Sequence, residues 1–489
     1  MIIKSTSIVL ITFSLILGSC QRDPILTNPS ARLNFSVDTV FFDTVFTTFG
    51  SATKHFMIYN HNTGSVKISS IILAGGSGSA FKINVDGNPG PNIKDIEIRS
   101  NDSAYVFVQV LINPARQNAP LLVLDSMVFE INGNEQNVKL AAWGQDIHLI
   151  KDSILKTQTW QNDKPYLIYD LGLVDSLSTL TIKEGTKIFL HKNALLAVKG
   201  TIIVNGTLEN PVVFRGDRLD YLNTAPPVAY NKLPSQWNRI LLFNSSTGNK
   251  FNYAEIRNGD IGLQVGDTSS IGHASVELSN CKIENHTAAG ILAINSKIDA
   301  YNCLFDNCGS FLFGCWVGGE YNFNQCTFAN YFLYGEKSGI ALFLSNYHLY
   351  EDPNTSVKTY VYGDLKKANF GNCIAFGDAL DEVYFQPDTG YQMNYVFNHC
   401  LIKGTTANLN VADQQKFIKT IISDKYDPGF KLIDNDNISF DFQLTKTSIA
   451  RDVGDTTIAT QFPLDFFGKS RFTDFGPDLG AFEYIGAGK

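Results

Sequence analysis

Residues 280–309 read NCKIENHTAAGILAINSKIDAYNCLFDNCG, and one short phrase occurs in them twice. Each copy reads Asn-Cys-x-apolar-x-Asn, and the two cysteines, Cys281 and Cys303, stand 22 residues apart. Self-similarity at such a period is typical of solenoids, in which each repeat stacks on the one before. The phrase recurs, with steps of 27, 22, 23, 47 and 27 residues, as AEIRN (254–258), CKIEN (281–285), CLFDN (303–307), CTFAN (326–330), CIAFG (373–377) and CLIKG (400–404).

One rung of such a stack explains the residue types of the phrase. Neighbouring rungs lie about 4.8 Å apart, and side chains alternate between the inside and the outside. The first and third residues then point inward, and the last residue falls at a bend, where stacked amides hydrogen-bond between coils and tolerate a left-handed backbone. We predict a first inward column of Ala254, Cys281, Cys303, Cys326, Cys373 and Cys400, a second of Ile256, Ile283, Phe305, Phe328, Ala375 and Ile402, and an asparagine ladder of Asn258, Asn285, Asn307 and Asn330.

The seven cysteines after residue 280 are better explained by packing than by chemistry. Neither a C-x₂-C pair nor a neighbouring histidine pair is present for zinc. An odd number excludes complete disulfide pairing within one chain. Five of the seven belong to the predicted column, where a thiol behaves as a small hydrophobe. A Cys308–Cys315 disulfide is the alternative for the remaining two, and Cys308, which follows the bend, is expected to lie outside the column.

The long step of 47 residues contains an excursion, residues 345–365, that leaves the stack and returns to it. Surplus loops of solenoids often emerge on a binding face. Tyrosine suits glycan stacking and protein interfaces, and the alternative is a loop packed on itself against the solenoid. The candidates for a binding surface are Tyr347, Tyr350, Tyr360 and Tyr362.

The flanks of the repeat extend the solenoid in both directions. The segment LTIKEGTKIFLHKNALLAVKGTIIVNGTLENPVVFRGD (180–217) resembles the opening coils of right-handed parallel β-helix proteins, the architecture of pectate lyases. The pieces LDFFGKSR and GPDLGAFEY of the tail resemble the ending of many bacterial β-helix proteins. The resemblance implies a β-helix over residues 148–445. Because an end coil exposes strand edges and core, we assign residues 446–489 to a C-terminal cap.

Ahead of the solenoid, residues 33–147 alternate between short apolar strands and turns. About seven such segments in this length indicate an immunoglobulin-like β-sandwich, here without cysteine. The segments DTVFFDTVFTTFGSATKHFMIYN and AAWGQD resemble the N-terminal module of Bacteroidota surface lipoproteins. The expected fold class is therefore all-β, with a sandwich followed by a right-handed parallel β-helix.

The N-terminus has the features of a lipoprotein signal peptide over residues 1–19. Lys4 precedes an apolar run that is too short to span a bilayer, and Leu17-Gly18-Ser19-Cys20 resembles the bacterial lipobox. The resemblance implies lipidation of Cys20, a tether over residues 20–32, and anchoring in the outer membrane with the body at the cell surface.

Charge and composition narrow the classes of partner. Removal of residues 1–19 leaves 38 basic against 47 acidic residues, a balance of −9, which argues against nucleic acid. We expect no cofactor. The run DNDN (434–437) has oxygen ligands for Ca²⁺ but lacks the spacing of an EF-hand loop, which favours a polar turn.

No known catalytic pattern of polysaccharide-cleaving β-helices is recognisable. Such enzymes need a carboxylate cluster for Ca²⁺ with a base, or paired aspartates with a histidine between glycines. Residues that could face outward on neighbouring rungs, read here as ordinary surface residues, are Asp299, Asp306, His286, His399 and Lys403.

The expected function is therefore a non-catalytic binding or scaffolding role at the outer membrane, as an accessory subunit of a membrane-protein assembly. A surface polysaccharide lyase or hydrolase is the first alternative, and a glycan-binding protein or adhesin is the second.

Overall fold

The computed structural model describes residues 23–114, 118–222, 224–268, 272–335, 339–351, 356–405, 409, 415–425, 427–484 and 486. The predictions for the signal peptide and Cys20 lie outside these residues. The chain divides into two compact units, one ending at Asp146 and the other beginning at Ile147.

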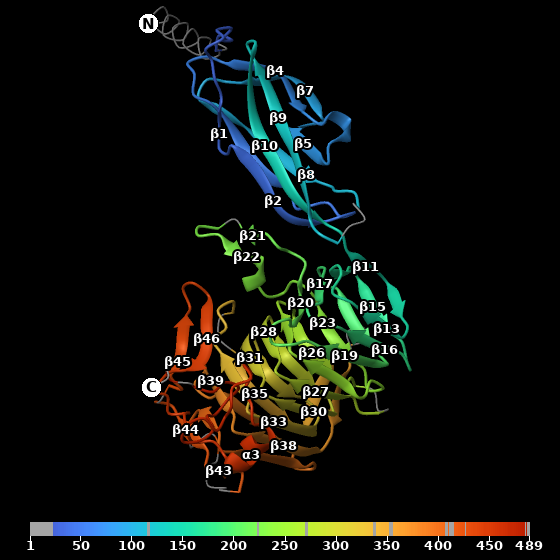
Figure 1. Ribbon diagram of the computed structural model, residues 1–489, viewed down its shortest axis with the longest axis vertical. Coiled ribbons are helices and arrows are strands. Elements are labelled where there is room, and N and C mark those ends of the chain that lie inside the picture. Colours follow the sequence, from blue (N-terminus) through green and yellow to red (C-terminus); the bar gives the residue numbers. More distant parts are fainter. Residues whose placement is uncertain are drawn as a thin grey trace, which may run out of the picture. The chain divides into compact units, whose positions relative to one another are not determined.

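The first unit is a sandwich of two five-stranded sheets, whose apolar side chains meet in one core, as predicted (Figure 1). Strict alternation places Val106, Val108 and Val110 inward on β8. All neighbours pair antiparallel except β2 and β10, which pair parallel. One sheet contains β1 (Asn34–Phe35), β3 (Lys54–Asn60), β8 (Asp102–Val110), β5 (Phe81–Val85) and β6 (Asn88–Pro89), and the other β2 (Thr39–Phe46), β10 (Asn134–Gln145), β9 (Leu121–Ile131), β4 (Val66–Leu73) and β7 (Asn92–Ile98), with the 3₁₀ turn η1 (Gly76–Gly78) after β4.

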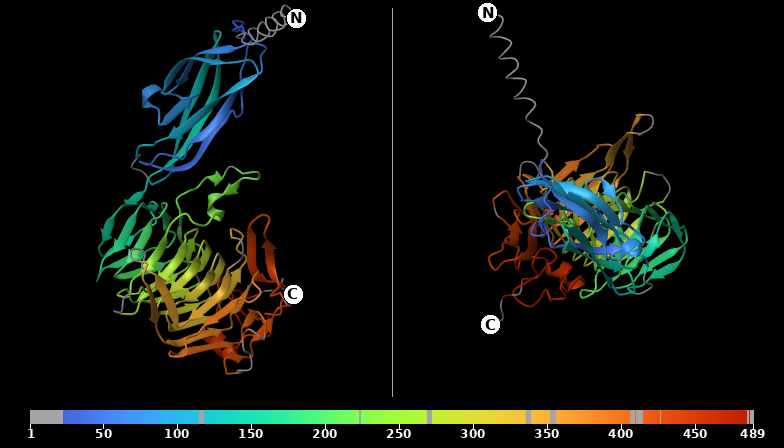
Figure 2. Two further views of the ribbon diagram at one scale, coloured as in Figure 1. Left: turned by 180° about the vertical axis from the view of Figure 1, so that it is seen from behind. Right: turned by 90° about the horizontal axis from the view of Figure 1, so that it is seen from above.

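The second unit is the predicted right-handed parallel β-helix, in which each coil adds one strand to each of three long parallel sheets (Figure 2). Among the described residues, the eleven-stranded sheet contains β11 (His148–Ile150), β14 (Tyr166–Ile168), β17 (Lys187–Leu190), β20 (Val212–Gly216), β25 (Ala254–Arg257), β28 (Lys282–His286), β31 (Leu304–Cys308), β34 (Thr327–Asn330), β39 (Ile374–Gly377), β42 (Leu401–Lys403) and β44 (Ile421–Ser423).

The other two sheets complete the coils. In the described part of the chain, the nine-stranded sheet contains β12 (Ser153–Leu155), β15 (Leu171–Val174), β18 (Leu195–Val198), β23 (Arg239–Leu242), β26 (Ile261–Val265), β29 (Ala289–Ala293), β32 (Phe311–Cys315), β35 (Ile340–Ser345) and β40 (Val383–Gln386), and the ten-stranded sheet β13 (Gln158–Trp160), β16 (Thr179–Ile182), β19 (Thr201–Asn205), β24 (Asn249–Asn252), β27 (Ser275–Ser279), β30 (Ser296–Tyr301), β33 (Gly319–Asn324), β38 (Leu365–Gly371), β41 (Met393–Asn398) and β43 (Phe417–Ile418).

Shorter elements leave the coils. They are the β21 (Tyr221–Leu222) and β22 (Val228–Ala229) pair, the 3₁₀ turn η2 (Tyr230–Lys232), the hairpin β36 (Tyr347–Glu351)–β37 (Lys358–Tyr362), the hairpin β45 (Phe430–Asp434)–β46 (Ser439–Leu444) and the helix α3 (Thr456–Gln461).

Both predicted inward columns are present. The strand registers align Ile256 with Ile283, Ile283 with Phe305 and Phe305 with Phe328, all fully buried. The cysteine column lies two residues earlier along each strand. Its thiols form hydrogen bonds with one another and with nearby backbone carbonyls. The Cys281 thiol, for example, donates to the carbonyl of Phe251 at 3.3 Å. Because the column is buried, it needs small apolar side chains, and cysteine behaves as one.

The amide ladder runs through Asn252, Asn280 and Asn302, ahead of the strands, so the prediction that it follows them was wrong. The left-handed backbone predicted after the strands is present, with φ values of 71° at Asn258, 61° at Asn285 and 53° at Asn307. Asn280 donates to Asn252 Oδ1, and Asn302 donates to Asn280 Oδ1, both at 3.2 Å. Asn280 and Asn302 have φ values of 52°, in the left-handed region that Asn tolerates. The predicted residues Asn258, Asn285, Asn307 and Asn330 bond mainly to backbone instead: the amides of Asn258 and Asn285, for example, donate to the carbonyls of the η2 turn.

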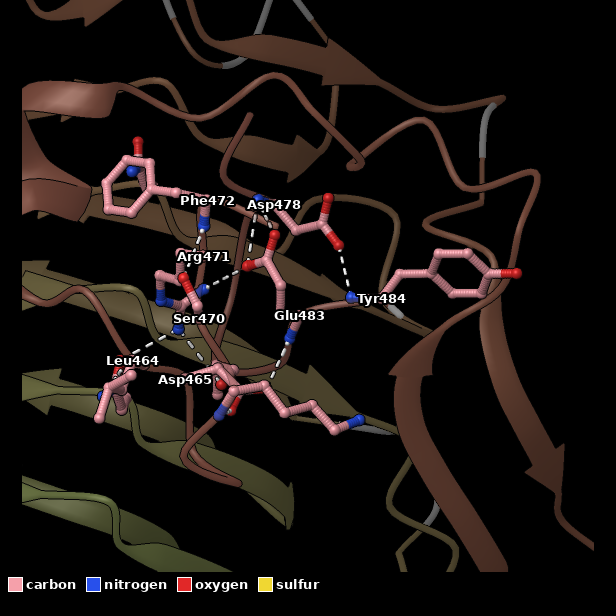
Figure 3. Close-up of polar contacts among 12 residues, drawn as sticks. Leu464, Asp465, Ser470, Arg471, Phe472, Asp478, Glu483 and Tyr484 are labelled. Atoms are coloured by element: carbon pink, nitrogen blue, oxygen red, sulfur yellow. Dashed lines mark hydrogen bonds and ion pairs between the residues drawn. The ribbon is translucent and has the colours of Figure 1, made fainter. Parts of the chain in front are cut away.

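The tail after residue 445 covers the flank of the eleven-stranded sheet. Phe466, Leu479 and Phe482 pack on Leu304 and Ile374, whose side chains point away from the solenoid core. Buried polar contacts fasten the tail. Arg471 is fully buried, and it donates to Glu483 Oε2 at 3.1 Å and to Asn302 Oδ1 at 3.0 Å (Figure 3).

Candidate binding cleft

The outer face of the eleven-stranded sheet changes character along the stack. In one column, Arg257, Glu284 and Asp306 are followed by Ala329 and Phe376. In the neighbouring column, Glu255 and Lys282 are followed by Leu304, Thr327 and Ile374. The tail covers the apolar part of this face, and the charged part forms the floor of a cleft.

The cleft has a volume of about 490 Å³. Its floor comes from β25, β28 and β31, and its walls come from the hairpin β45–β46, the loop 331–334 and the η2 turn, elements that Figure 1 shows on the same side of the solenoid. Tyr334, Phe440 and Phe467 are among the aromatic residues of the lining. Apolar rings around a few charged groups are the usual composition of a ligand site.

Three backbone contacts hold the walls in place. The Tyr334 hydroxyl donates to the carbonyl of Lys232 at 2.9 Å, and the Asn285 amide donates to the same carbonyl at 2.8 Å. The Lys232 ammonium donates to the carbonyl of Asn437 in the turn of β45–β46, at 2.7 Å. The η2 turn therefore links the floor strand β28 to the other two wall elements, the loop 331–334 and the hairpin β45–β46.

Arg257 organises the charges of the floor. Its guanidinium bonds Glu255 Oε2 at 3.0 Å and Glu284 Oε1 at 3.3 Å, while its buried Nε has no hydrogen-bond partner. The Lys282 ammonium makes no hydrogen bond and no ion pair with the described residues, although the charge of Glu284 raises the pKa of Lys282. The floor thus carries hydrogen-bond donors that the protein leaves unused.

Asp306 is the most unusual residue of the cleft. It lines the floor at only 3% exposure, its Oδ1 accepts from the Asn307 amide at 2.8 Å, and its Oδ2 has no partner. Burial, and after it the negative charge of Glu284, raise the pKa of Asp306 well above its usual range. A buried polar atom without a partner costs free energy, and a ligand that bonds this oxygen would remove the cost.

The predicted tyrosine surface is divided between the two faces of the hairpin β36–β37. Tyr347, Tyr360 and Tyr362 share one face with ring centroids 5.9–6.1 Å apart, and Tyr391 stacks on Tyr362 at 5.0 Å. Tyr350 lies on the opposite face.

The opposite face of this hairpin packs against the solenoid. His348 stacks on Trp316 at 3.9 Å, and Val361 joins the apolar cluster beneath it. Both alternatives therefore apply: one face is packed, and the other presents tyrosines, with Tyr360 53% exposed.

Cys308 lies outside the cysteine column, as predicted, but it is fully buried, and the alternative Cys308–Cys315 disulfide is absent because both thiols are free. The outward position predicted for His286 was wrong. His286, which occupies the position equivalent to Cys308, also points inward. It accepts from the Gly259 N–H at Nδ1, and burial lowers its pKa to about 4. At the end of β28 and of β31, the side chain that follows the asparagine therefore points into the core, whereas the repeat pattern left it outside.

The other outward candidates do not form one site. Asp299 pairs with Lys297 at 3.6 Å on the ten-stranded sheet, His399 lies 3.7 Å from Asp455, and the Lys403 ammonium lies over the Phe376 ring. The DNDN run forms the turn of β45–β46, where Asp434 accepts from Asn437. Within the described residues, no group of three or more His, Cys, Asp and Glu side chains is arranged to hold a metal ion.

The sequence contained the signal for the cleft. The second and fourth residues of the repeated phrase are Glu255 and Arg257, then Lys282 and Glu284, then Leu304 and Asp306. Strand alternation places all of them outward. The predicted site residues nevertheless do not include Arg257, Lys282 and Glu284, and Asp306 was predicted to be an ordinary surface residue.

The likenesses to solved structures reported below are distant ones. No family model and no curated protein matches the chain. Among solved structures, the catalytic unit of a GH87 alpha-1,3-glucanase from Streptomyces thermodiastaticus is 9% identical at a TM-score of 0.22, covering 71% of this chain and 79% of that one.

Two further likenesses cover a smaller share of this chain. A PapD-like domain of human CEP192 is 13% identical at a TM-score of 0.17, covering 26% of this chain and 95% of that one. A family 123 glycoside hydrolase from Clostridium perfringens is 12% identical at a TM-score of 0.17, covering 23% of this chain and 25% of that one. The chain thus spans about a quarter of the hydrolase. Likenesses this low carry no argument about function.

Proposed function

We propose that this protein is a glycan-binding lipoprotein of the outer membrane and that the cleft on the eleven-stranded sheet is its binding site. The observation that carries the proposal is the floor of the cleft, where Asp306 and Arg257 keep buried polar atoms without partners. A ligand rich in hydroxyl groups supplies both donors and acceptors to such atoms.

The form of the cleft supports a polymeric sugar as the ligand. Successive strands of the floor lie about 4.8 Å apart. This spacing is close to the length that one sugar unit adds to an extended chain. Tyr334, 39% exposed on the wall, offers a ring for stacking on a sugar face.

The test is a binding measurement with matched tyrosine variants. The full chain, purified in mild detergent, is screened on a glycan array, and hits are titrated by calorimetry. Tyr334→Ala is expected to weaken binding about tenfold, a loss of about 1.4 kcal/mol. Tyr384→Ala is the control, since Tyr384 is exposed on the nine-stranded sheet, outside the cleft. Equal affinity of all three proteins would contradict the proposal.

The tyrosine face of β36–β37 is a second candidate surface, for a glycan or an outer-membrane protein partner. The row of Tyr347, Tyr360, Tyr362 and Tyr391 favours it, because the last three of these rings are exposed. Tyr360→Ala is expected to weaken capture of the partner from mild-detergent extracts, whereas Tyr350→Ala, on the opposite face of the same hairpin, is not. Equal capture by both variants would contradict this surface.

The anchor and the location are part of the same proposal. Lipidation of Cys20 would tether the chain to the membrane while the cleft stays in water. Across the described residues, no helix combines the length and the apolar character needed to cross a bilayer. Metabolic labelling with a fatty-acid analogue, lost in Cys20→Ala, together with protease digestion of intact cells, tests lipidation and surface exposure separately.

A further inference from the structure

Two carboxyl groups lie side by side on the floor of the cleft. Glu284 on β28 and Asp306 on β31 are register partners in neighbouring parallel strands, and both line the cleft. Neighbouring strands are about 4.8 Å apart. The backbones of the two residues are therefore one strand spacing apart, and retaining glycosidases hold their two carboxyl groups about 5–5.5 Å from each other.

The two carboxyl groups have different surroundings. Glu284 accepts a hydrogen bond from the Arg257 guanidinium at 3.3 Å. Its carboxyl therefore lies next to a permanent positive charge. Asp306 is 3% exposed, has an Oδ2 without a partner, and has a raised pKa. Burial favours the neutral form of Asp306, whereas the Glu284 carboxyl lies against the Arg257 guanidinium. Enzymes that use two carboxyl groups in different roles place them in such different surroundings.

We propose that the cleft hydrolyses a glycosidic bond of the glycan it binds, with Asp306 as the acid and base and Glu284 as the nucleophile. This inference rests on the proposed function, because it needs a glycan in the same cleft.

The first step forms a glycosyl ester. The Asp306 carboxyl gives its proton to the glycosidic oxygen, the bond from the anomeric carbon to that oxygen breaks, and its electron pair stays on the oxygen. A Glu284 oxygen bonds the anomeric carbon from the opposite face, and the shortened glycan leaves as an alcohol.

The second step restores the enzyme. The Asp306 carboxylate removes a proton from water as the water oxygen attacks the anomeric carbon, and the ester bond to Glu284 breaks with its electron pair on the carboxylate. The sum is one water consumed for each glycosidic bond cleaved. Two inversions at the anomeric carbon leave its configuration retained.

Arg257 and Lys282 are positioning residues in this scheme. Arg257 holds the nucleophilic oxygens of Glu284 between β25 and β28, and its second bond to Glu255 fixes the guanidinium. Lys282 lies beside both Glu284 and Asp306, and its charge opposes the rise in the pKa of Asp306. The reaction therefore needs no group that these side chains do not provide.

The experiment measures new reducing ends released from each polysaccharide that the full chain binds. Cleavage of at least one, with retained configuration by NMR, is expected. Asp306→Asn should lower the rate about 10²–10⁴-fold while binding is kept. Asp299→Asn, an aspartate of the ten-stranded sheet outside the cleft, is the matched control and should leave the rate unchanged.

Azide separates the two roles from simple loss of folding. With 2,4-dinitrophenyl glycosides of the released sugar, azide should restore turnover of Asp306→Asn with retained configuration, and turnover of Glu284→Gly with inverted configuration. Inverted product from the wild type, or full activity in Glu284→Gly, would overturn the roles. Binding without cleavage would overturn hydrolysis alone, whereas absence of any binding would overturn the proposed function as well.

Discussion

Asp306 and Ala329 occupy the same outward position on successive rungs, one on β31 and the other on β34. Asp306 lies on the floor of the cleft, whereas Ala329 is fully buried beneath the C-terminal tail. The surface that the C-terminal tail covers therefore ends between these two rungs, where the outward side chain changes from apolar to charged. The tail needs apolar side chains to pack on, so the charged rungs before Ala329 remain accessible to a ligand.

The buried ion pair of the tail should control its attachment. Arg471→Met leaves Glu483 buried without its cation, and it removes the bond to Asn302. Loss of one partner of a buried pair costs about 3–5 kcal/mol. Urea unfolding should show this loss, and the double variant with Glu483→Gln should recover part of it. Unchanged stability in Arg471→Met would contradict the role of this pair.

The seven cysteines of the β-helix, Cys20 not included, should be inert in the folded protein. All lie in the core, where burial raises the pKa of Cys308 and Cys315 and hinders access by reagents. A thiol reagent should modify none of them before unfolding and all seven afterwards, as counted by mass spectrometry. Rapid modification of Cys308 in the native protein would show that this thiol is not in the core.

The amide ladder should contribute stability at Asn280. Asn280→Gly keeps a residue that adopts the left-handed φ of 52° but removes both hydrogen bonds, and Asn280→Ala adds backbone strain. We expect a loss of about 1–2 kcal/mol for Asn280→Gly and a larger one for Asn280→Ala. Chemical unfolding of the three proteins checks this order, and equal stability of both variants would show that strain does not matter.

A buried carboxyl at Glu382 should make stability depend on pH. Its oxygens accept from the N–H groups of Ala341 at 2.8 Å and Ala379 at 3.0 Å, and burial raises the pKa of Glu382 to about 8. The unfolded value is about 4.3, so the folded state holds a proton that the unfolded state has lost, and stability falls as pH rises from about 4.3 through about 8.

Glu382→Gln isolates this effect, because the variant does not titrate at this position. The wild type should lose stability relative to Glu382→Gln between pH 5 and pH 9, measured by urea unfolding at both values. A constant difference between the two proteins across that range would contradict the raised pKa.

The solenoid could be predicted because its signal is repeated. Cys281, Cys303 and Cys326 stand in one register, and any error at one rung is corrected by the others. The two bends could not be told apart in this way, because Asn precedes and follows the strand in the same phrase and is left-handed at both places. The side-chain hydrogen bonds show that Asn280 and Asn302 form the ladder.

The cleft was harder to predict because it is formed by distant segments. Strand alternation indicates that Glu284 and Asp306 point outward, but the wall comes from β45–β46, more than a hundred residues later. Burial of Asp306 depends on those segments. A repeat pattern contains no information about what covers its outer face.

Hydrogen exchange in the presence of the bound glycan reports where the ligand lies. We expect slower exchange in the cleft, at β25, β28, β31 and the hairpin β45–β46, and unchanged exchange at β36–β37. Slower exchange confined to β36–β37, with no change in the cleft strands, would contradict glycan binding in the cleft.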